Sequence, residues 1–309
     1  MSTPLQRPAW SRGDSIFDPA ARLLGSLPLT AEWAWGGATG RGVRVAVLDS
    51  GVQSDHPALQ GCVDEADGIA LHLSDAGEVI EEPGPHEDLF GHGTACAAII
   101  HSIAPEARIT SVRVLGATLT GRGKVFLRAL AWAVEKGYDV INLSLTTAKR
   151  DWALPFYEVC DRAYFRGCFV VTSANNFPVV SFPSLYSSVA SVACNVATDP
   201  FEFHVNPDPP VEFLAPGIDI EVAWRGSLTM RATGNSFAAP HISGIAALIR
   251  GKHPGLRPAE IKSVLLATAA NVPISGASGL TGTRDSMPRD GVSARARSAI
   301  MPAVVPPRL

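Results

Sequence analysis

The sequence lacks the marks of several protein classes. It has no apolar run near the ~20 residues needed to span a bilayer, and its N-terminus lacks the basic start and apolar core of a secretory signal. A formal net charge of −3 leaves no basic surplus for binding nucleic acid or an anionic membrane. We therefore expect a protein with neither nucleic acid nor membrane among its partners.

Cysteine is scarce as well. The five cysteines are an odd number, are widely spaced and include no Cys-x-x-Cys pair, so neither a disulfide framework nor a zinc site is indicated. This pattern favours a reducing, cytoplasmic location. The cysteines are Cys62, Cys96, Cys160, Cys168 and Cys194.

What the chain does contain is an alternation of strand and helix patterns. With 46% hydrophobic and 18% charged residues in 309, it can bury a sizeable core. The alternation predicts an α/β fold, a three-layer, doubly wound, mainly parallel sheet with helices on both faces. Strands are expected at 42–49, 108–115, 139–145, 168–174 and 189–193, and helices at 31–35, 95–100, 124–136, 157–164, after residue 235 and at 258–268.

The predicted domain occupies residues 31–270. Residues 1–30 form an N-terminal arm, which either wraps on the domain surface or lies across a cleft as an inhibitory segment. Residues 271–309 are rich in Ser, Gly, Ala, Pro and Arg and have no periodicity. We expect them to form a flexible tail.

Ser236 lies in the stretch GNSFAAPH at 234–241, at the start of a predicted buried helix. Pro240 is expected in the first helical turn, where proline is tolerated. A serine at a helix start is commonly an N-cap, but the positive end of the helix dipole also suits an oxyanion-forming nucleophile. Only partners elsewhere in the chain can decide between these readings.

Two other residues stand where an α/β sheet gathers its functional groups. Asp49 ends an apolar, β-branched strand pattern, and His92 lies between two glycines at a helix start. The helix dipole disfavours imidazolium, so we expect a lowered pKa for His92. Each residue alone has an ordinary reading, as a turn carboxylate and a loop histidine.

Together, Asp49, His92 and Ser236 supply what acyl transfer requires. A serine hydroxyl needs a base to take its proton, and the base needs an acceptor on its other ring nitrogen. Donors must also meet the developing oxyanion. A side-chain amide at a strand end, Asn175 or Asn176, can provide one.

The stretches around these residues resemble the active-site motifs of the subtilases, the subtilisin-like serine peptidases. They are VAVLDSG at 45–51, GHGT at 91–94 and GNSFAAPH at 234–241, in the order Asp, His, Ser. Secondary motifs at 54–57, 140–145 and 214–217 agree, and the resemblance covers roughly residues 31–270.

The resemblance implies a role for each residue. Asp49 orients the imidazole, His92 is general base and acid, and Ser236 attacks the peptide carbonyl. Asn176 is the oxyanion donor, with Asn175 at a position where the family usually has glycine; a shift of one residue would exchange the two.

The resemblance also implies a peptide or protein substrate, bound as an extended strand between two segments of the chain. Phe177 and Ser181 fall where the family lines its main pocket, which argues for an apolar or small primary side chain. Phe90 replaces an acidic residue of members that cut after basic pairs, so we do not expect a dibasic-specific convertase. The two strand-pairing segments include Gly121, Gly123, Leu143, Ser144 and Leu145.

Some positions depart from the family pattern. Asn235 precedes the nucleophile where threonine is common. Residues 97–105 run on without the calcium-binding loop of many secreted members, and the acidic group of Asp64, Glu65 and Asp67 is expected to be a solvated loop. We therefore expect no metal and no cofactor, and a member that folds without a long propeptide.

Three functions fit these residues. The first is a serine endopeptidase that matures a specific peptide or protein precursor in the cytoplasm. The second is a catalytically idle subtilase fold that acts as a binding module. The third is a peptide transacylase or ligase, in which an amine replaces water in resolving the acyl-enzyme.

Overall fold

The computed structural model describes residues 29–207 and 209–272. Its main sheet has nine strands in the order β3-β2-β4-β1-β5-β6-β7-β9-β8. Pairing is parallel from β2 to β9, and the outermost strands β3 and β8 are antiparallel to their neighbours. The strands are β1 (Arg44–Asp49), β2 (Ile69–Leu73), β3 (Val79–Pro83), β4 (Arg108–Arg113), β5 (Val140–Leu143), β6 (Phe169–Ser173), β7 (Ala190–Asn195), β8 (His204–Val205) and β9 (Phe213–Pro216).

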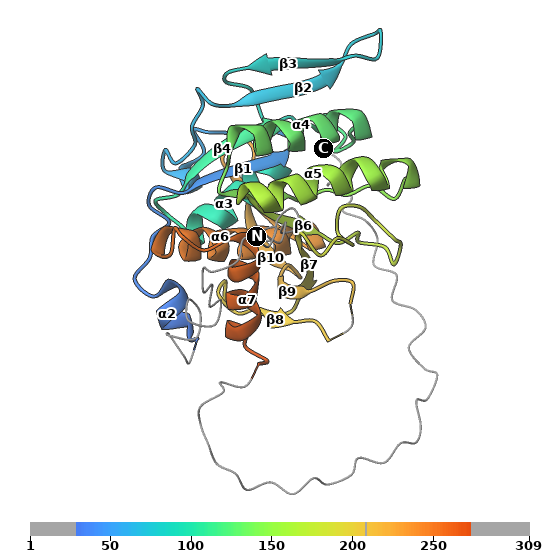
Figure 1. Cartoon of the computed structure of the whole chain (residues 1–309). Coiled ribbons are helices and arrows are strands. Elements are labelled where there is room, and N and C mark those ends of the chain that lie inside the picture. The colour runs from blue at the N-terminus through green and yellow to red at the C-terminus, as the bar shows by residue number, and fades with distance from the viewer. Residues whose placement is uncertain (1–28, 208, 273–309) are drawn as a thin grey trace, which may run out of the picture.

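Helices cover both faces of this sheet, which confirms the predicted three-layer α/β class (Figure 1). Helices α3 and α6 pack on one face, whereas α4 and α5 lie together on the other. The helices are α2 (Ala31–Trp35), α3 (His92–Ile103), α4 (Gly123–Lys136), α5 (Ala153–Arg166), α6 (Asn235–Lys252) and α7 (Pro258–Thr268), with short 3₁₀ turns at Pro57–Leu59 and Arg150–Trp152.

Strand β1 shows why its sequence is apolar throughout. Val45 and Val47 face the core under α3 and α6, and Ala46 and Leu48 face the core under α4 and α5. A strand buried on both faces has no polar side to alternate with. Hydrophobic burial on two faces thus places β1 in the middle of the sheet, between β4 and β5.

The position of β1 also determines where the functional site lies. From β1 the chain passes through the β2–β3 hairpin and α3 to β4, which lies on one side of β1, and then through α4 to β5, which lies on the other side. The carboxyl end of β1 is therefore a topological switch point, where open α/β sheets form their crevices. Asp49 is the last residue of β1.

Two details differ from the sequence expectations. A second sheet, the hairpin of β10 (Ile220–Trp224) and β11 (Leu228–Ala232), was not predicted. The side chain of Asn271 hydrogen-bonds both backbone groups of Val205 at 2.8 Å, so this first residue of the expected tail is attached to β8. Most of the predicted arm and tail, residues 1–28 and 273–309, lie outside the described residues.

Candidate active site

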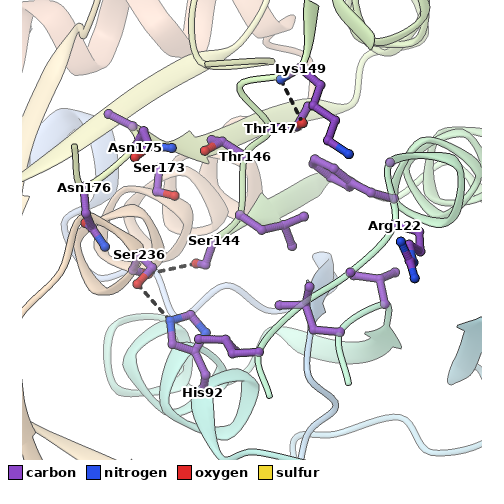
Figure 2. A pocket seen from close by; sticks show the side chains of 18 of the residues that line it. His92, Arg122, Ser144, Thr146, Thr147, Lys149, Ser173, Asn175, Asn176 and Ser236 are labelled. Atoms are coloured by element: carbon purple, nitrogen blue, oxygen red, sulfur yellow. Dashed lines mark hydrogen bonds between the residues drawn. The ribbon is translucent and has the colours of Figure 1, made fainter. Parts of the chain in front are cut away.

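The structure brings Asp49, His92 and Ser236 into one hydrogen-bonded chain. The Nδ1 atom of His92 lies 2.8 Å and 2.9 Å from the two carboxylate oxygens of Asp49. Its Nε2 atom lies 2.8 Å from the Ser236 hydroxyl oxygen (Figure 2). These distances allow a proton to pass from the serine to the imidazole while the carboxylate holds the ring.

Close backbone packing sets this arrangement. A Cβ on Gly93 would lie 1.9 Å from the carbonyl oxygen of Gly51, so only glycine lets α3 begin directly against the turn after β1. Phe237 packs its ring 5.0 Å from the imidazole of His92, measured between centroids. Asp49 is completely buried and His92 is 4% exposed, so water competes little for their hydrogen bonds.

Burial of the imidazole opposes its charged form, but the Asp49 carboxylate outweighs that effect and the pKa of His92 lies well above its ordinary value. The prediction of a lowered pKa at this helix start is therefore wrong. The reason is distance: a full negative charge in direct contact with the ring acts more strongly than the partial charge of a helix terminus.

The triad opens into a cleft of about 430 Å³ at the carboxyl edge of the sheet. Asn175 and Asn176 line it and differ in their contacts. The Asn175 side-chain oxygen accepts the N–H of Phe177, whereas the Asn176 oxygen accepts the N–H of Asn235. Figure 2 shows the Asn176 amide nitrogen pointing toward Ser236, while Asn175 lies beside Ser173. Asn176 is thus the better placed of the two to meet an oxyanion.

A sequence model of the subtilase family matches residues 40–291 of this chain. The chain belongs to the subtilase family. Among similar proteins, Subtilisin from Bacillus pumilus is 32% identical over 249 residues, which cover 75% of this chain and 86% of that protein. Subtilisin E from Bacillus subtilis (strain 168) is 31% identical over 248 residues, or 75% of this chain. The match spans 62% of the length of Subtilisin E.

Solved structures share the fold of this subtilase. A cold-adapted subtilisin-like serine proteinase has a TM-score of 0.60 at 21% sequence identity, covering 76% of this chain and 87% of that one. The S41 psychrophilic protease gives a TM-score of 0.63 at 22% identity, with the same coverage of both chains.

The predicted substrate-binding residues of this subtilase divide into two groups. Gly121, Gly123, Ser144, Leu145 and Phe177 line the cleft.

Three predicted positions do not line the cleft. The side chain of Leu143 is fully buried under α4 and α5, because it belongs to the core of the sheet. Ser181 is 2% exposed and its hydroxyl pairs with that of Ser184 at 2.8 Å. Phe90 packs edge-on against Trp224 with ring centroids 5.5 Å apart, on the hairpin that the sequence did not predict.

Asp88 is a buried positioning residue that the sequence analysis missed. One carboxylate oxygen accepts the Ser50 hydroxyl and the N–H groups of Phe90 and Gly91, and the other accepts the N–H and hydroxyl of Thr94. This carboxylate therefore ties the loop before His92 to the residue after Asp49. Its spacing of two residues before Phe90 is that of an Asx turn, which is the signal that could have revealed it.

Asn235 also does more than its position beside the nucleophile suggests. Its side-chain oxygen accepts the N–H of Cys194, and its amide nitrogen donates to the carbonyl of Asn175 at 3.0 Å. The residue thus joins the start of α6 to β7 and to the loop that carries Asn176.

The buried Cys96 adds a thiol beside the triad. Its sulfur lies 3.3 Å from the Ser144 hydroxyl and 3.7 Å from the Asp49 carboxylate. Burial raises the pKa of the Cys96 thiol, so it stays neutral at ordinary pH. Among the described residues, Asp49, His92 and Cys96 form one cluster of metal-ligand type, and it is the triad region itself.

The acidic loop expected to be solvated is largely engaged with cations. Asp64 lies 3.5 Å from Arg108, and Asp67 lies 2.9 Å from Arg44 and accepts the Tyr138 hydroxyl at 2.6 Å. These pairs occupy carboxylate oxygens that a hard cation would need.

Within residues 29–207 and 209–272, no helix is long and apolar enough to cross a membrane.

Proposed function

We propose that this subtilase hydrolyses peptide bonds as a serine endopeptidase, through an acyl-enzyme on Ser236. The observation that carries the proposal is the unbroken hydrogen-bonded chain from Asp49 through His92 to Ser236 at the edge of an open cleft. Every group needed for nucleophilic attack and proton transfer is within hydrogen-bonding distance of the next.

Each residue has a defined step. The Ser236 oxygen attacks the scissile carbonyl as its proton passes to Nε2 of His92, and the imidazolium gives that proton to the leaving amine. Water then attacks the acyl carbon, His92 takes a proton from that water, and the proton returns to the Ser236 oxygen as the ester bond breaks. The Asp49 carboxylate keeps Nδ1 as the donor and stabilises the imidazolium.

Asn176 is the proposed oxyanion donor. Its oxygen is held at 2.9 Å by the N–H of Asn235, which leaves the amide nitrogen as the donor facing Ser236. A donor fixed before the reaction costs no reorganisation in the transition state, and such a group contributes about 3–4 kcal/mol.

The substrate binds as an extended peptide between the segment that carries Gly121 and Gly123 and the segment that carries Ser144 and Leu145. Both segments line the cleft next to the triad, and backbone pairing along them would accept many sequences. Selectivity for particular substrate side chains then depends on the other groups that line the cleft.

We place this activity in the cytoplasm, where it matures a specific peptide or protein precursor. Support comes from the cysteines, all five of which are free thiols. Burial raises the pKa of several thiols, to about 11 for Cys62, which suits structural residues more than redox-active ones. Fractionation of the native host, with detection of the chain in the cytosolic or the secreted fraction, tests the location.

A fluorophosphonate probe and a peptide library test the activity. Wild type is expected to take the label on Ser236 and to cleave library peptides into two fragments, and Ser236→Ala is expected to do neither. Ser263→Ala, on the exposed face of α7, is the matched control and should behave as wild type.

Product masses separate the other functions. Products joined to an added amine, instead of hydrolysed ones, would assign a transacylase. A folded wild-type protein that neither labels nor cleaves would overturn the enzyme proposal and favour a binding module.

A further inference from the structure

The cleft carries positive charge on one side, away from the oxyanion residues. Arg122 and Lys149 line it, and its described lining residues include neither aspartate nor glutamate. Figure 2 shows both cationic side chains on the opposite side of the cleft from Asn175 and Asn176. The two ends of the cleft therefore differ in charge.

Two elements bring these cations to the same part of the cleft. Arg122 immediately precedes α4, and Lys149 lies in the loop after β5, just before the 3₁₀ turn Arg150–Trp152. A Cβ on Gly123 would lie 2.3 Å from Cε2 of Trp152, so the start of α4 rests directly against the segment that follows Lys149. This contact places Arg122 and Lys149 on adjoining segments of the cleft wall.

The surroundings between them suit an extended chain with a charged tip. Phe126, on the first turn of α4, is 4% exposed and lines the cleft together with Leu119 and Leu145. These apolar groups can contact the methylene part of a side chain while the cations meet its end. The N-terminus of α4, which has no side-chain cap, adds a partial charge of the same sign.

Neither cation is neutralised within the part of the chain that the structure describes. Arg128 on the same helix pairs with Glu81 and Glu135, but no ion pair involves Arg122 or Lys149 among residues 29–207 and 209–272. Both side chains are exposed. Two unpaired cations over an apolar floor form a receptor for a carboxylate, because a single acidic group can be shared between them.

We propose that this end of the cleft binds an acidic side chain of the peptide substrate, on the acyl side of the scissile bond, between Arg122 and Lys149. The inference rests on the proposed endopeptidase function and names its substrate class. Because alternate side chains of an extended peptide point to opposite faces, the preference for Asp or Glu belongs to one substrate position. Immediate neighbours of that position point elsewhere.

A set of matched peptides tests this proposal. Each peptide carries Glu, Gln or Lys at one position from the second to the fifth residue before the cleaved bond, and kcat/KM is measured for each. Wild type should prefer Glu over Gln at one position by roughly five- to tenfold at low salt, as expected for two exposed ion pairs. The ratio should fall toward one at 1 M salt, where the screening length is only about 3 Å.

Variants identify the responsible side chains. In Arg122→Gln/Lys149→Gln the ratio of Glu to Gln peptides should drop to about one, and in Arg122→Glu/Lys149→Glu the Lys peptide should become the best substrate. Arg150→Gln and Arg150→Glu change the charge of an exposed neighbour outside the cleft lining and should keep the wild-type ratio. Labelling of Ser236 by the fluorophosphonate shows that each variant is folded.

The possible results test the acidic preference separately from the proposed endopeptidase function. If the Glu and Gln peptides are cleaved with equal kcat/KM at every position, the acidic preference is wrong and the endopeptidase function is still supported. An equal preference for Glu at every position, including those after the cleaved bond, or one that persists in the double variant, would also overturn it. No cleavage of any peptide would instead count against the endopeptidase.

Discussion

The hydroxyl of Ser144 donates a hydrogen bond of 2.8 Å to the backbone carbonyl of Ser236. That carbonyl would ordinarily accept the N–H of the residue four positions later in α6, but the residue there is Pro240, which has none. Pro240 was predicted to lie in the first turn of the helix. It is instead the sixth residue of α6, beyond that turn. The residue that follows β5 thus supplies a side-chain hydroxyl in place of the helix hydrogen bond that Pro240 cannot make to the nucleophile's carbonyl.

Ser144→Ala is expected to lower both stability and turnover. The change leaves the Ser236 carbonyl and the side-chain nitrogen of Asn142, which also donates to Ser144, without this partner. Two buried groups that lose a hydrogen bond should cost about 1–3 kcal/mol in the free energy of unfolding. Urea unfolding measures that cost, and kcat reports any shift of Ser236.

Ser263→Ala serves again as the control, because its hydroxyl bonds a helix carbonyl at the surface. It should change the free energy of unfolding by less than about 0.5 kcal/mol. Equal stabilities of Ser144→Ala and wild type would show that the Ser144 hydrogen bond adds nothing measurable at this carbonyl, which the Cys96 sulfur also contacts at 3.6 Å.

Asn176→Ala should reduce kcat by about 10²–10³-fold with little change in KM, because the amide acts on charge that develops only in the transition state. Steady-state kinetics on one good peptide measure the split. Asn175→Ala is the matched comparison: its oxygen holds a turn, and its amide does not point toward Ser236. A larger kcat loss in Asn175→Ala would exchange the roles of the two residues.

The pH dependence of kcat/KM should follow His92. The base must be neutral to take the serine proton, and Asp49 raises the pKa of the buried imidazole. Activity should therefore be low below the pKa and rise with pH, with a midpoint above the ordinary histidine value of about 6.5. A midpoint at or below that value would contradict the assignment.

The variant Asp49→Asn separates the effect of the carboxylate on the pKa of His92 from the effect of burial. Burial alone lowers the pKa of His92, so the midpoint should move below that of wild type. The value of kcat should fall by about 10⁴-fold, because an amide neither holds the ring in the correct tautomer nor stabilises the imidazolium as the carboxylate does. Histidine NMR in the Ser236→Ala background measures the same pKa without turnover.

His241 should make the protein acid-sensitive. Burial lowers the pKa of its imidazole to about 4; Nδ1 lies 3.1 Å from the Pro200 carbonyl, and among the described residues Nε2 has no partner. The unfolded chain therefore binds a proton more readily between about pH 6.5 and 4. Stability present above pH 6.5 is lost as the pH falls through that window, by about 3 kcal/mol in total.

Urea unfolding at pH 7 and pH 4 measures this loss in wild type and in His241→Gln. The variant should lose about 3 kcal/mol less than wild type over the same interval. His72→Gln, at an exposed histidine of β2, should lose as much as wild type. Identical losses in all three proteins would remove His241 as the source.

The elements that the sequence predicts well are those whose boundaries are marked locally. The predicted helices at 31–35 and 258–268 match α2 and α7, since Thr30 caps the first and Pro258 opens the second. By contrast, the β10–β11 hairpin was not predicted. Its turn residues Gly226 and Ser227 both adopt positive φ, which is a hairpin signal, but its two strands lack a clear alternation of apolar and polar residues.

The site shows the same division. Asp49, His92 and Ser236 were found because each stands in a short motif at the end of a strand or the start of a helix. The roles of Ser144 and Asn235 in holding them were not predicted, because both act through backbone groups far along the chain. Such contacts depend on how three elements meet, and no spacing in the sequence records them.

The contact of Gly93 with Gly51 has a consequence for how this protein can change through substitution. The separation of Asp49 and His92 is set where the backbone at Gly93 touches the backbone at Gly51, with no side chain between them. Substitutions elsewhere around the cleft can alter which peptides enter without resetting that separation. Substrate preference and the geometry of Asp49 and His92 are in this sense separate properties, and a side chain at residue 93 would disturb the second.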